Sequence, residues 1–541
     1  MDKFQTITAG NRTDRYDFLQ LSEFLSEVDQ KILAAMWRNN IVGLSAAVFQ
    51  DNRIIWSKGY GYADLRAGRE ATPETVYRIA SISKTITATA LMQLYDQGKF
   101  QLDDDISSYL GYVVRNPRYP NIKITFRQLL THTSSIIDEG TYNRVVEETP
   151  GLLKEIDIRT FLVPGGKYYS PENFADYSPG TGFTYSNLSF NLIGSLVEVI
   201  SRERFDRYTI RHIFAPLQMD ASFDPADIQN WENFAVLYKF DQGKEIFVPS
   251  RDDYRGEKPK RLVVTAPLGS ALGWGPTGAA RMSVLDLSKF MLAHMNSGIY
   301  NYVRILEKNT ADLMHQIQWW GYGLEGLYKL KGLGFHITDD LVLGQRLIGH
   351  PGEAEGLVGD AYFDPDNKFG FVFLMNGGIW GSAKPIYEIE TAIANILYNQ
   401  FAPRVCCSVR RVCGITGSNI ICVNGRRIVL PMPAVIEGPD FVPEMTAADV
   451  LKAAIELDES RTTLVLRYGG NSVTLKVGNP SMLVNNRLVV LPTAPYWAYG
   501  HIMVPLKKLG RELGIAVVFF CPLVSEEQCL DTKMNRLCSH E

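Results

Sequence analysis

Apolar residues recur at helical spacing in several stretches of the chain and form short uninterrupted runs in others. The helical pattern covers residues 17–37, 81–97, 126–130, 188–200, 284–296 and 386–399. Short apolar runs predict strands at residues 43–49, 54–57, 347–352, 359–363 and 369–375. Because strands lie at both ends with helices between them, we expect an α+β domain whose antiparallel sheet joins the two ends of the stretch.

Two stretches interrupt this pattern. Residues 136–182 carry many Gly, Pro and Tyr residues with little periodicity, so we expect a long functional loop, such as a lid. Near residue 403 the composition shifts to Cys, Arg, Gly and Ser, which indicates a linker. At 541 residues the chain is too long for one core. The expected parts are a first domain at 1–402, a linker at 403–418, a second domain at 419–525 and a tail at 526–541.

The second domain contains an internal repeat. Val423-Asn424-Gly425-Arg426 is echoed by Val484-Asn485-Asn486-Arg487, and Phe441-Val442-Pro443 is echoed by Met503-Val504-Pro505. Each Val-Pro pair precedes a helical stretch, and Tyr468-Gly469-Gly470-Asn471 between the copies predicts a hairpin. We therefore expect a small α/β domain with two related halves.

Composition narrows the functional class. The formal net charge is −4 and basic runs are short, so we expect no nucleic-acid partner. No apolar run is long enough to span a membrane, and the first residues lack the apolar core of a signal peptide. As written, the sequence predicts a cytoplasmic protein.

The cysteines are confined to one end of the chain, which excludes a cysteine nucleophile from the first domain. Their number is odd and their spacings match no zinc-binding pattern. We therefore expect free or partly paired thiols, no metal and no cofactor. The seven are Cys406, Cys407, Cys413, Cys422, Cys521, Cys529 and Cys538.

Ser81 and Lys84 form an S-x-x-K pair at the start of the helical stretch 81–97. Residues three apart lie on the same face of a helix, so the amine would lie one turn from the hydroxyl. A serine becomes a good nucleophile when a neighbouring base takes its proton, and a lysine can do this when burial lowers its pKa. The helix N-terminus adds N–H groups where negative charge develops. The pattern also arises by chance, so an ordinary exposed Ser and Lys remain the alternative.

Several motifs accompany this pair. They are Tyr60-Gly61-Tyr62-Ala63-Asp64, Leu129-Leu130-Thr131-His132-Thr133-Ser134, Pro179-Gly180, Tyr185-Ser186-Asn187 and His350-Pro351-Gly352. In order and spacing the set resembles the serine β-lactamase and penicillin-binding-protein superfamily, in the branch of class C β-lactamases, D-Ala-D-Ala carboxypeptidases, D-aminopeptidases and family VIII esterases. The resemblance runs from about residue 20 to about residue 400. It implies a β-lactamase/transpeptidase-like fold that includes an all-helical subdomain.

The resemblance implies roles for the residues around the S-x-x-K pair. Ser81 resembles the acylated nucleophile, Lys84 its proton acceptor, and Tyr185 the tyrosine that shares general acid–base catalysis. Asn187 resembles the side chain that holds the lysine and the substrate amide. The motif that contains His132 is expected to be structural, holding the helix under the site.

On the strand side, His350 and Gly352 match the motif beside the nucleophile, where many members carry Lys-Thr-Gly. The N–H of Glu353 would then form the oxyanion hole with the N–H of the nucleophile. Here Pro351 replaces the hydroxyl residue and His350 the lysine, and Glu353 and Glu355 add negative charge. Repulsion of a substrate carboxylate is expected, which favours neutral esters or substrates with a free amine.

The second domain resembles the small α/β domain named after the N-terminal domain of copper amine oxidases. No ligand cluster for copper is present, so no metal is implied. We expect an accessory module that binds a cell-envelope or protein partner. Such domains often accompany extracytoplasmic enzymes in bacteria, which conflicts with the missing signal peptide and leaves two compartments open.

Together these residues predict a serine hydrolase that acts through an acyl-enzyme on a small molecule or short peptide. We favour an esterase or a D-amino-acid amidase or peptidase, with weak β-lactamase or carboxypeptidase activity beside it. Two alternatives stay open: a true β-lactamase and a non-catalytic penicillin-binding or ligand-binding receptor. The intact Ser, Lys, Tyr and Asn set argues against the receptor.

Overall fold

The computed structural model describes most of the chain up to residue 402 and parts of the remainder. The described residues are 25–320, 330–338, 341–342, 345–365, 367–380, 386–402, 408–414, 420–423, 426–429, 441–451, 453–458, 460, 462–468, 471–491, 493–498, 501–513 and 515–520. The chain divides into two compact units. The first contains the chain up to His315 with Gly332–Ile337 and Leu347–Pro403, and the second contains Gln316–Lys331, Thr338–Arg346 and the chain from Arg404. The expected tail at 526–541 lies outside the described residues.

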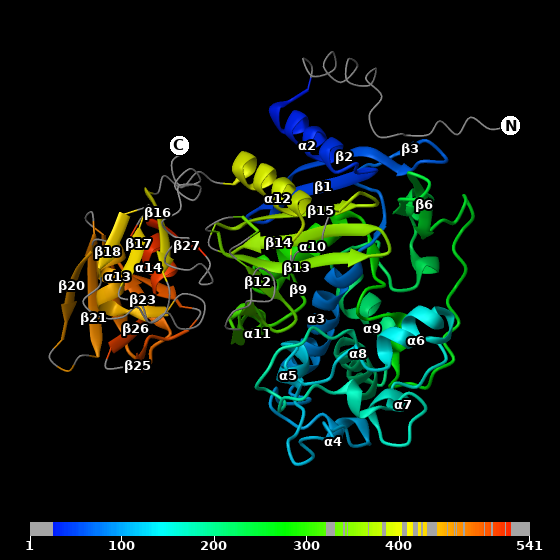
Figure 1. The fold of residues 1–541 in the computed structure, drawn as a ribbon, viewed down its shortest axis with the longest axis horizontal. Helices are drawn as coiled ribbons and strands as arrows, with labels where there is room; N and C mark the ends of the chain where they lie inside the picture. Colours follow the sequence, from blue (N-terminus) through cyan, green and yellow to red (C-terminus); the bar gives the residue numbers. More distant parts are fainter. Residues whose placement is uncertain are drawn as a thin grey trace. The chain divides into compact units, whose positions relative to one another are not determined.

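An antiparallel sheet forms the centre of the first unit (Figure 1). Its strands follow the order β12-β13-β14-β15-β1-β2-β3, so β1 from the start of the chain pairs with β15 from its end. The expected joining of the two ends is therefore confirmed. Strands β14 and β15 are buried along their whole length, which explains their apolar runs. The bounds are β1 Gly43–Gln50, β2 Arg53–Asp64, β3 Arg69–Glu70, β12 His336–Thr338, β13 Leu347–Ala354, β14 Leu357–Asp364 and β15 Phe369–Met375.

Helices lie on both sides of this sheet (Figure 1). Helix α12 (Glu388–Phe401) packs against β14, β15 and α2 (Glu27–Arg38), while α10 (Val284–Met295) packs against β1, β14 and β15. Helix α2 begins at a capping box made by Ser26 and Asp29. It begins ten residues after the predicted start at residue 17, and residues 17–24 lie outside the described part of the chain.

Helix α8 and the helices that it contacts, α3, α4, α5 and α9, form the expected helical subdomain of the first unit. The stretch 136–182, expected to be a loop, is partly helical because it includes α6 and α7. Tyr142 and Val145 are the buried residues of α6, a signal too short to show as periodicity. The bounds are α3 Ser83–Asp96, α4 Ser107–Leu110, α5 Phe126–Leu130, α6 Tyr142–Glu148, α7 Arg159–Leu162, α8 Asn187–Ser201, α9 Phe205–Thr209 and α11 Lys308–His315.

Short antiparallel strand pairs complete the described chain before residue 332. The pair β4–β7 bears most directly on the position of Ser81, because it holds the chain just before that residue. The pairs are β4 Tyr77–Arg78 with β7 Arg281–Met282, β5 Leu237–Asp241 with β6 Ile246–Arg251, β8 Ile299–Tyr300 with β9 Val303–Arg304, and β10 Trp319–Trp320 with β11 Leu330–Lys331.

The internal repeat of the second unit appears as a structural repeat. Strands β17 and β18 form one hairpin, and β23 and β24 form the corresponding one. Asn485 and Asn486 have φ angles of 48° and 69°, the left-handed pair that a two-residue hairpin turn favours. The two Val-Pro strands, β19 and β26, pair with each other and place Val442 opposite Val504. The bounds are β17 Ile420–Val423, β18 Arg426–Val429, β19 Phe441–Pro443, α13 Glu444–Leu451, β23 Ser481–Val484, β24 Arg487–Val490, β26 His501–Pro505 and α14 Leu506–Glu512.

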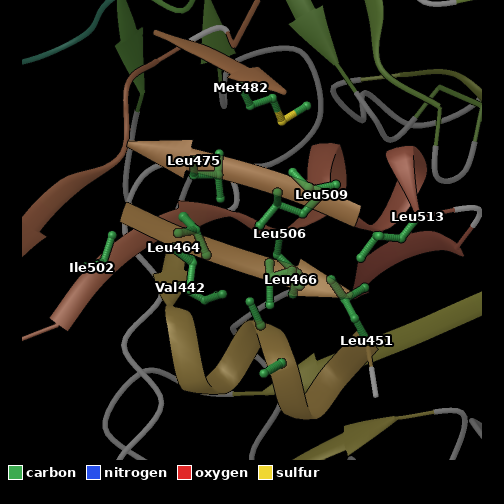
Figure 2. Close-up of a cluster of buried hydrophobic side chains, with 14 of the residues drawn as sticks. Val442, Leu451, Leu464, Leu466, Leu475, Met482, Ile502, Leu506, Leu509 and Leu513 are labelled. Atoms are coloured by element: carbon green, nitrogen blue, oxygen red, sulfur yellow. The ribbon is translucent and has the colours of Figure 1, made fainter. Parts of the chain in front are cut away.

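Both helices of the repeat contribute to one apolar core (Figure 2). Leu464, Leu466 and Leu475 from β21 and β22 face Leu506 and Leu509 of α14 in this core. The predicted hairpin at 468–471 is confirmed by the pairing of β21 with β22. The other bounds are β16 Ser408–Gly414, β20 Ala454–Leu457, β21 Thr463–Tyr468, β22 Asn471–Lys476, β25 Tyr496–Ala498 and β27 Ile515–Phe520.

Two of the seven cysteines lie within the described residues. Cys413 and Cys422 stand opposite each other on β16 and β17. The described helices include none with the length and apolar character needed to cross a bilayer. The predicted α+β class with a small second domain is confirmed.

Candidate active site

Ser81 lies in a tight turn at the entrance to α3. A single turn of 3-10 helix, Ala80–Ile82, runs directly into α3, and Ser81 is half-buried there. Ala80 has a φ of 45°, a left-handed conformation that is strained for a residue with a side chain and is concentrated at functional sites. The serine therefore opens the helical segment, as the sequence predicts, on a strained turn that the sequence does not reveal.

Helix α3 is buried on all sides although it is rich in polar residues. Thr85, Thr87 and Thr89 donate their hydroxyls to backbone carbonyl oxygens three or four residues earlier. Polar side chains that are paired in this way can be buried without a large cost. The helix can therefore carry Lys84 into the interior, where its side chain is inaccessible to solvent.

The Lys84 amine lies at hydrogen-bond distance from the serine. Its Nζ is 2.9 Å from Ser81 Oγ and donates to the Thr277 carbonyl oxygen at 3.0 Å. The same nitrogen lies 4.9 Å from the centre of the Tyr185 ring. Burial lowers the pKa of Lys84 from 10.5 to about 7, and the Asp138 carboxylate acts in the opposite direction. Near neutral pH a large share of this lysine is the free amine, which can accept a proton.

Tyr185 is held by the motif that contains His132. The imidazole of His132 stacks on the Tyr185 ring with centroids 4.5 Å apart, and its Nδ1 accepts the Ser186 backbone N–H at 3.0 Å. Ser186 is the N-cap of α8 and accepts the Ser189 N–H at 3.0 Å. His132 thus contacts the segment that carries the tyrosine, which agrees with the structural role expected for its motif.

Asn187 contacts a residue that the sequence did not single out. Its side-chain Nδ2 and its backbone N–H donate to Asp138 Oδ2 at 2.9 Å and 2.7 Å. Asp138 Oδ1 accepts the Leu188 N–H at 2.9 Å and the Ser186 hydroxyl at 3.1 Å. Burial raises the pKa of Asp138, while these donated bonds and Lys84 act to lower it. The amide nitrogen of Asn187 thus faces Asp138, where the sequence led us to expect a contact with the lysine.

Strand β13 passes directly beside the turn that carries Ser81. A Cβ at Gly352 would lie 2.7 Å from the Ile79 carbonyl oxygen, so the close approach requires glycine. His350 is buried, and its Nδ1 lies 2.7 Å from the Pro351 carbonyl oxygen. The ring of His336 on β12 packs against His350 with centroids 4.3 Å apart, and both rings lie 6.3 Å from Tyr185.

The sequence predicts that the two glutamates after this motif add uncompensated negative charge, and the structure differs from that prediction. Glu355 forms ion pairs with Arg251 at 2.8 Å and with Arg78 at 3.9 Å, and these arginines help to hold its pKa below the usual value. Glu353 is exposed and accepts the Tyr387 hydroxyl at 2.6 Å. The expected repulsion of a substrate carboxylate therefore depends on Glu353 alone of the two, because the two arginines compensate the charge of Glu355.

The structure thus brings Ser81 and Tyr185 to the buried amine of Lys84, and strand β13 lies beside them. Sequence reasoning missed Thr277, Asp138, His336 and the arginine pair. Asp138 lies 49 residues from Asn187 in the chain, so no local pattern links them. Within the described residues, no three His, Cys, Asp or Glu side chains gather as they would around a metal ion.

Two parts of the chain match known protein families. The family model for beta-lactamase matches residues 28–388, and the model for the copper amine oxidase N-terminal domain matches residues 422–519. The chain belongs to the β-lactamase family. Both resemblances drawn from the sequence are confirmed by these matches.

The β-lactamase family relatives include Protein flp of Staphylococcus aureus (strain N315), which is 28% identical over 369 residues, covering 68% of this chain and 66% of that protein. The putative penicillin-binding protein PbpX of Bacillus subtilis (strain 168) is 26% identical over 311 residues, covering 56% of this chain and 68% of that protein. The aligned part is thus less than two thirds of the first relative's length.

Solved structures of the same fold include the octameric penicillin-binding protein homologue from Pyrococcus abyssi, with a TM-score of 0.53 and 20% identity over 88% of this chain and 94% of that one. The D-amino acid amidase from Ochrobactrum anthropi SV3 has a TM-score of 0.52 and 19% identity over 69% and 99% of the two chains. EstCE1, a hydrolase with promiscuous acyltransferase activity, has a TM-score of 0.52 and 20% identity over 71% and 100%. At these identities the likeness establishes the fold.

Proposed function

We propose that this member of the β-lactamase family is a serine hydrolase that works through an acyl-enzyme. The observation that carries the proposal is the pair of Ser81 Oγ and Lys84 Nζ at 2.9 Å. Because the lysine is buried and its pKa is about 7, it can take the serine proton at neutral pH without a separate histidine. Ser81 follows Ala80, whose left-handed backbone belongs to the 3-10 turn that carries the hydroxyl.

In the first half of the reaction Ser81 Oγ adds to the substrate carbonyl carbon while its proton passes to Lys84, with Tyr185 sharing the transfer. The backbone N–H groups of Ser81 and Glu353 stabilise the resulting oxyanion. The leaving alcohol or amine then takes the proton as its bond to carbon breaks. In the second half a water molecule gives its proton to the same base and its oxygen adds to the acyl carbon. The acid departs and the serine recovers its proton.

We place the substrates among neutral esters and D-amino-acid amides or short peptides. His350 and Pro351 occupy the β13 positions where related proteins offer a lysine and a hydroxyl to a substrate carboxylate. A hydrogen bond to a charged group contributes roughly 1.5–3 kcal/mol, so its loss reduces acylation of a carboxylate-bearing substrate by about ten- to a hundredfold. The fold neighbours named D-amino acid amidase and EstCE1 support this placement.

The test measures kcat/KM for matched substrate pairs. A D-alanyl amide with a free N-terminus is compared with an N-acylated D-Ala-D-Ala, and a plain p-nitrophenyl ester is compared with nitrocefin. We expect the first of each pair to react at least tenfold faster. The control is Ser81→Ala, which should lose both turnover and labelling by a fluorophosphonate while keeping its thermal unfolding temperature.

Each other outcome has a distinct meaning. Undiminished labelling of the Ser81→Ala protein contradicts the nucleophile. Faster reaction of the carboxylate-bearing substrates contradicts the substrate class and points to Arg78 or Arg251 as the cation. Binding of fluorescent penicillin with no turnover of any substrate supports the receptor alternative instead.

A further inference from the structure

Within the part of the chain that the structure describes, each group that contacts the Asp138 carboxylate is a hydrogen-bond donor. The four groups that contact its carboxylate are the Ser186 hydroxyl, the Asn187 and Leu188 backbone N–H groups and the Asn187 side-chain amide. Each oxygen accepts two of these four bonds. A proton on either oxygen would face a donor, so the arrangement fits the ionised carboxylate. The start of α8, a helix of 15 residues, favours a negative charge at the same place.

This carboxylate fixes the orientation of the Asn187 side chain. A carboxylate can only accept hydrogen bonds, so the NH₂ end of the carboxamide must face Asp138. The Asn187 carbonyl oxygen therefore points away from Asp138 and is left for a donor such as a lysine amine or a substrate N–H. Without Asp138 the carboxamide could rotate by half a turn and present the wrong group.

The same carboxylate acts on the general base through its charge. Asp138 accepts hydrogen bonds from the start of α8, and α8 packs against α3, the helix that carries Lys84. Both side chains are buried, and each shifts the pKa of the other in the direction expected for opposite charges. The other titratable groups around the amine are Ser81 and Tyr185, and His132, His336 and His350 lie beyond the tyrosine. Asp138 is thus the charged group that favours the protonated lysine, which forms when the serine gives up its proton.

We propose that Asp138 is a positioning residue of the acylation step: it orients the Asn187 carboxamide and strengthens Lys84 as a base. The proposal rests on the proposed function, because it concerns the same acyl-enzyme. It differs from a role as a simple helix cap, which would affect stability and leave the pH dependence of acylation unchanged.

The test measures the rate of fluorophosphonate labelling against pH for the full chain and for Asp138→Asn. In the wild type the rate should rise with pH around the pKa of Lys84, because only the free amine accepts the serine proton. Removal of the neighbouring negative charge should move this midpoint down by about one pH unit. The plateau rate should fall by about tenfold or more, because the amine becomes a weaker base and Asn187 loses its fixed orientation.

Ser283→Ala is the matched control. It removes the side-chain cap of α10 and a hydroxyl that donates to the Asp286 carboxylate, while Asp138 and Asn187 keep their contacts. We expect a lower unfolding temperature for this variant with an unchanged midpoint. Asp138→Glu and Asp138→Gln form a second pair that is equal in size and differs in charge, and it serves if Asp138→Asn does not fold. The midpoint should be lower in the Gln variant than in the Glu variant.

The outcomes separate the two proposals. A wild-type chain that is not labelled, or one that is labelled equally after Ser81→Ala, overturns the proposed function itself. A wild-type chain with a clear midpoint, together with a folded Asp138→Asn variant of the same midpoint and plateau, overturns the role of Asp138 and leaves the function standing. An equal midpoint in the Asp138→Glu and Asp138→Gln variants also overturns the role of Asp138 and leaves the proposed function standing.

Discussion

At the scale of single residues, the site depends on burying a lysine in a helix that solvent does not reach. This burial lowers the pKa of Lys84 to about 7 from 10.5, so the folded chain holds fewer protons than the unfolded chain between these values. The stability contributed by this residue therefore rises with pH across that window. The residue makes the chain less stable near neutral pH than an apolar side chain of similar size would.

Replacement of this lysine directly tests how much folding stability is lost by burying it. Lys84→Met should abolish labelling and raise the free energy of unfolding relative to the wild type. The difference should shrink between pH 7.5 and pH 9 by roughly 1.4 kcal/mol per pH unit, because the wild type gains stability over this range. Chemical denaturation at the two pH values measures this difference, with Lys31→Met, at a solvent-exposed position of α2, as the control. A difference that does not change with pH would show that the lysine is charged in the folded chain.

The residues that the sequence identified and those it missed differ in how far apart in the chain the contacting partners lie. Ser81 and Lys84 are three residues apart, so helical geometry brings them together and the sequence alone can say so. Thr277 reaches the same amine across 193 residues, and Arg251 neutralises Glu355 across 104 residues. The sequence shows the charges of such residues but not their partners, which is why the charge at the end of β13 was overestimated.

At the scale of elements, the turn that carries Ser81 and strand β13 must touch if the proposed oxyanion hole is to form. Gly352 allows this contact, because a side chain there would meet the Ile79 carbonyl oxygen and the Ile82 side chain. Such close packing leaves little room for adjustment, and overpacking typically costs about 1–3 kcal/mol.

Gly352→Ala should therefore separate the strand from the serine. We expect acylation to fall by about ten- to a hundredfold, because a displaced oxyanion donor loses most of its effect. Stopped-flow labelling measures the rate, and thermal unfolding measures the fold. Gly151→Ala is the control, since a Cβ there meets no atom within 4 Å. An acylation rate equal to that of the control would show that β13 does not supply the donor.

Elements with long periodic patterns were predictable, and short ones were not. Helices α8, α10 and α12 lie where the apolar spacing predicts them, because apolar residues recur at helical spacing over several turns of each. Helix α7 has four residues and α6 has seven, so neither could produce a periodic signal within 136–182. The tertiary contacts that stabilise such short helices cannot be read from their own sequence.

At the scale of the whole molecule, the chain divides into two compact units. The second unit buries its own set of apolar residues, drawn from both halves of the repeat. The repeat was visible in the sequence because the hairpin turns and the Val-Pro strands recur, and the pairing of β19 with β26 shows how the two halves meet. The sequence alone could not give that pairing, because it joins residues 62 positions apart, Val442 and Val504.

Residues 1–402 should fold and hydrolyse small esters without the second domain. Ser81, Lys84, Tyr185 and the β13 residues all precede residue 402, and every cysteine follows residue 405. The fragment should therefore match the full chain in kcat/KM for a p-nitrophenyl ester, with or without a reducing agent. Addition of the separate fragment 403–541 should leave the rate unchanged. A monodisperse but inactive 1–402 fragment, beside an active full chain, would mean that the second domain completes the catalytic site.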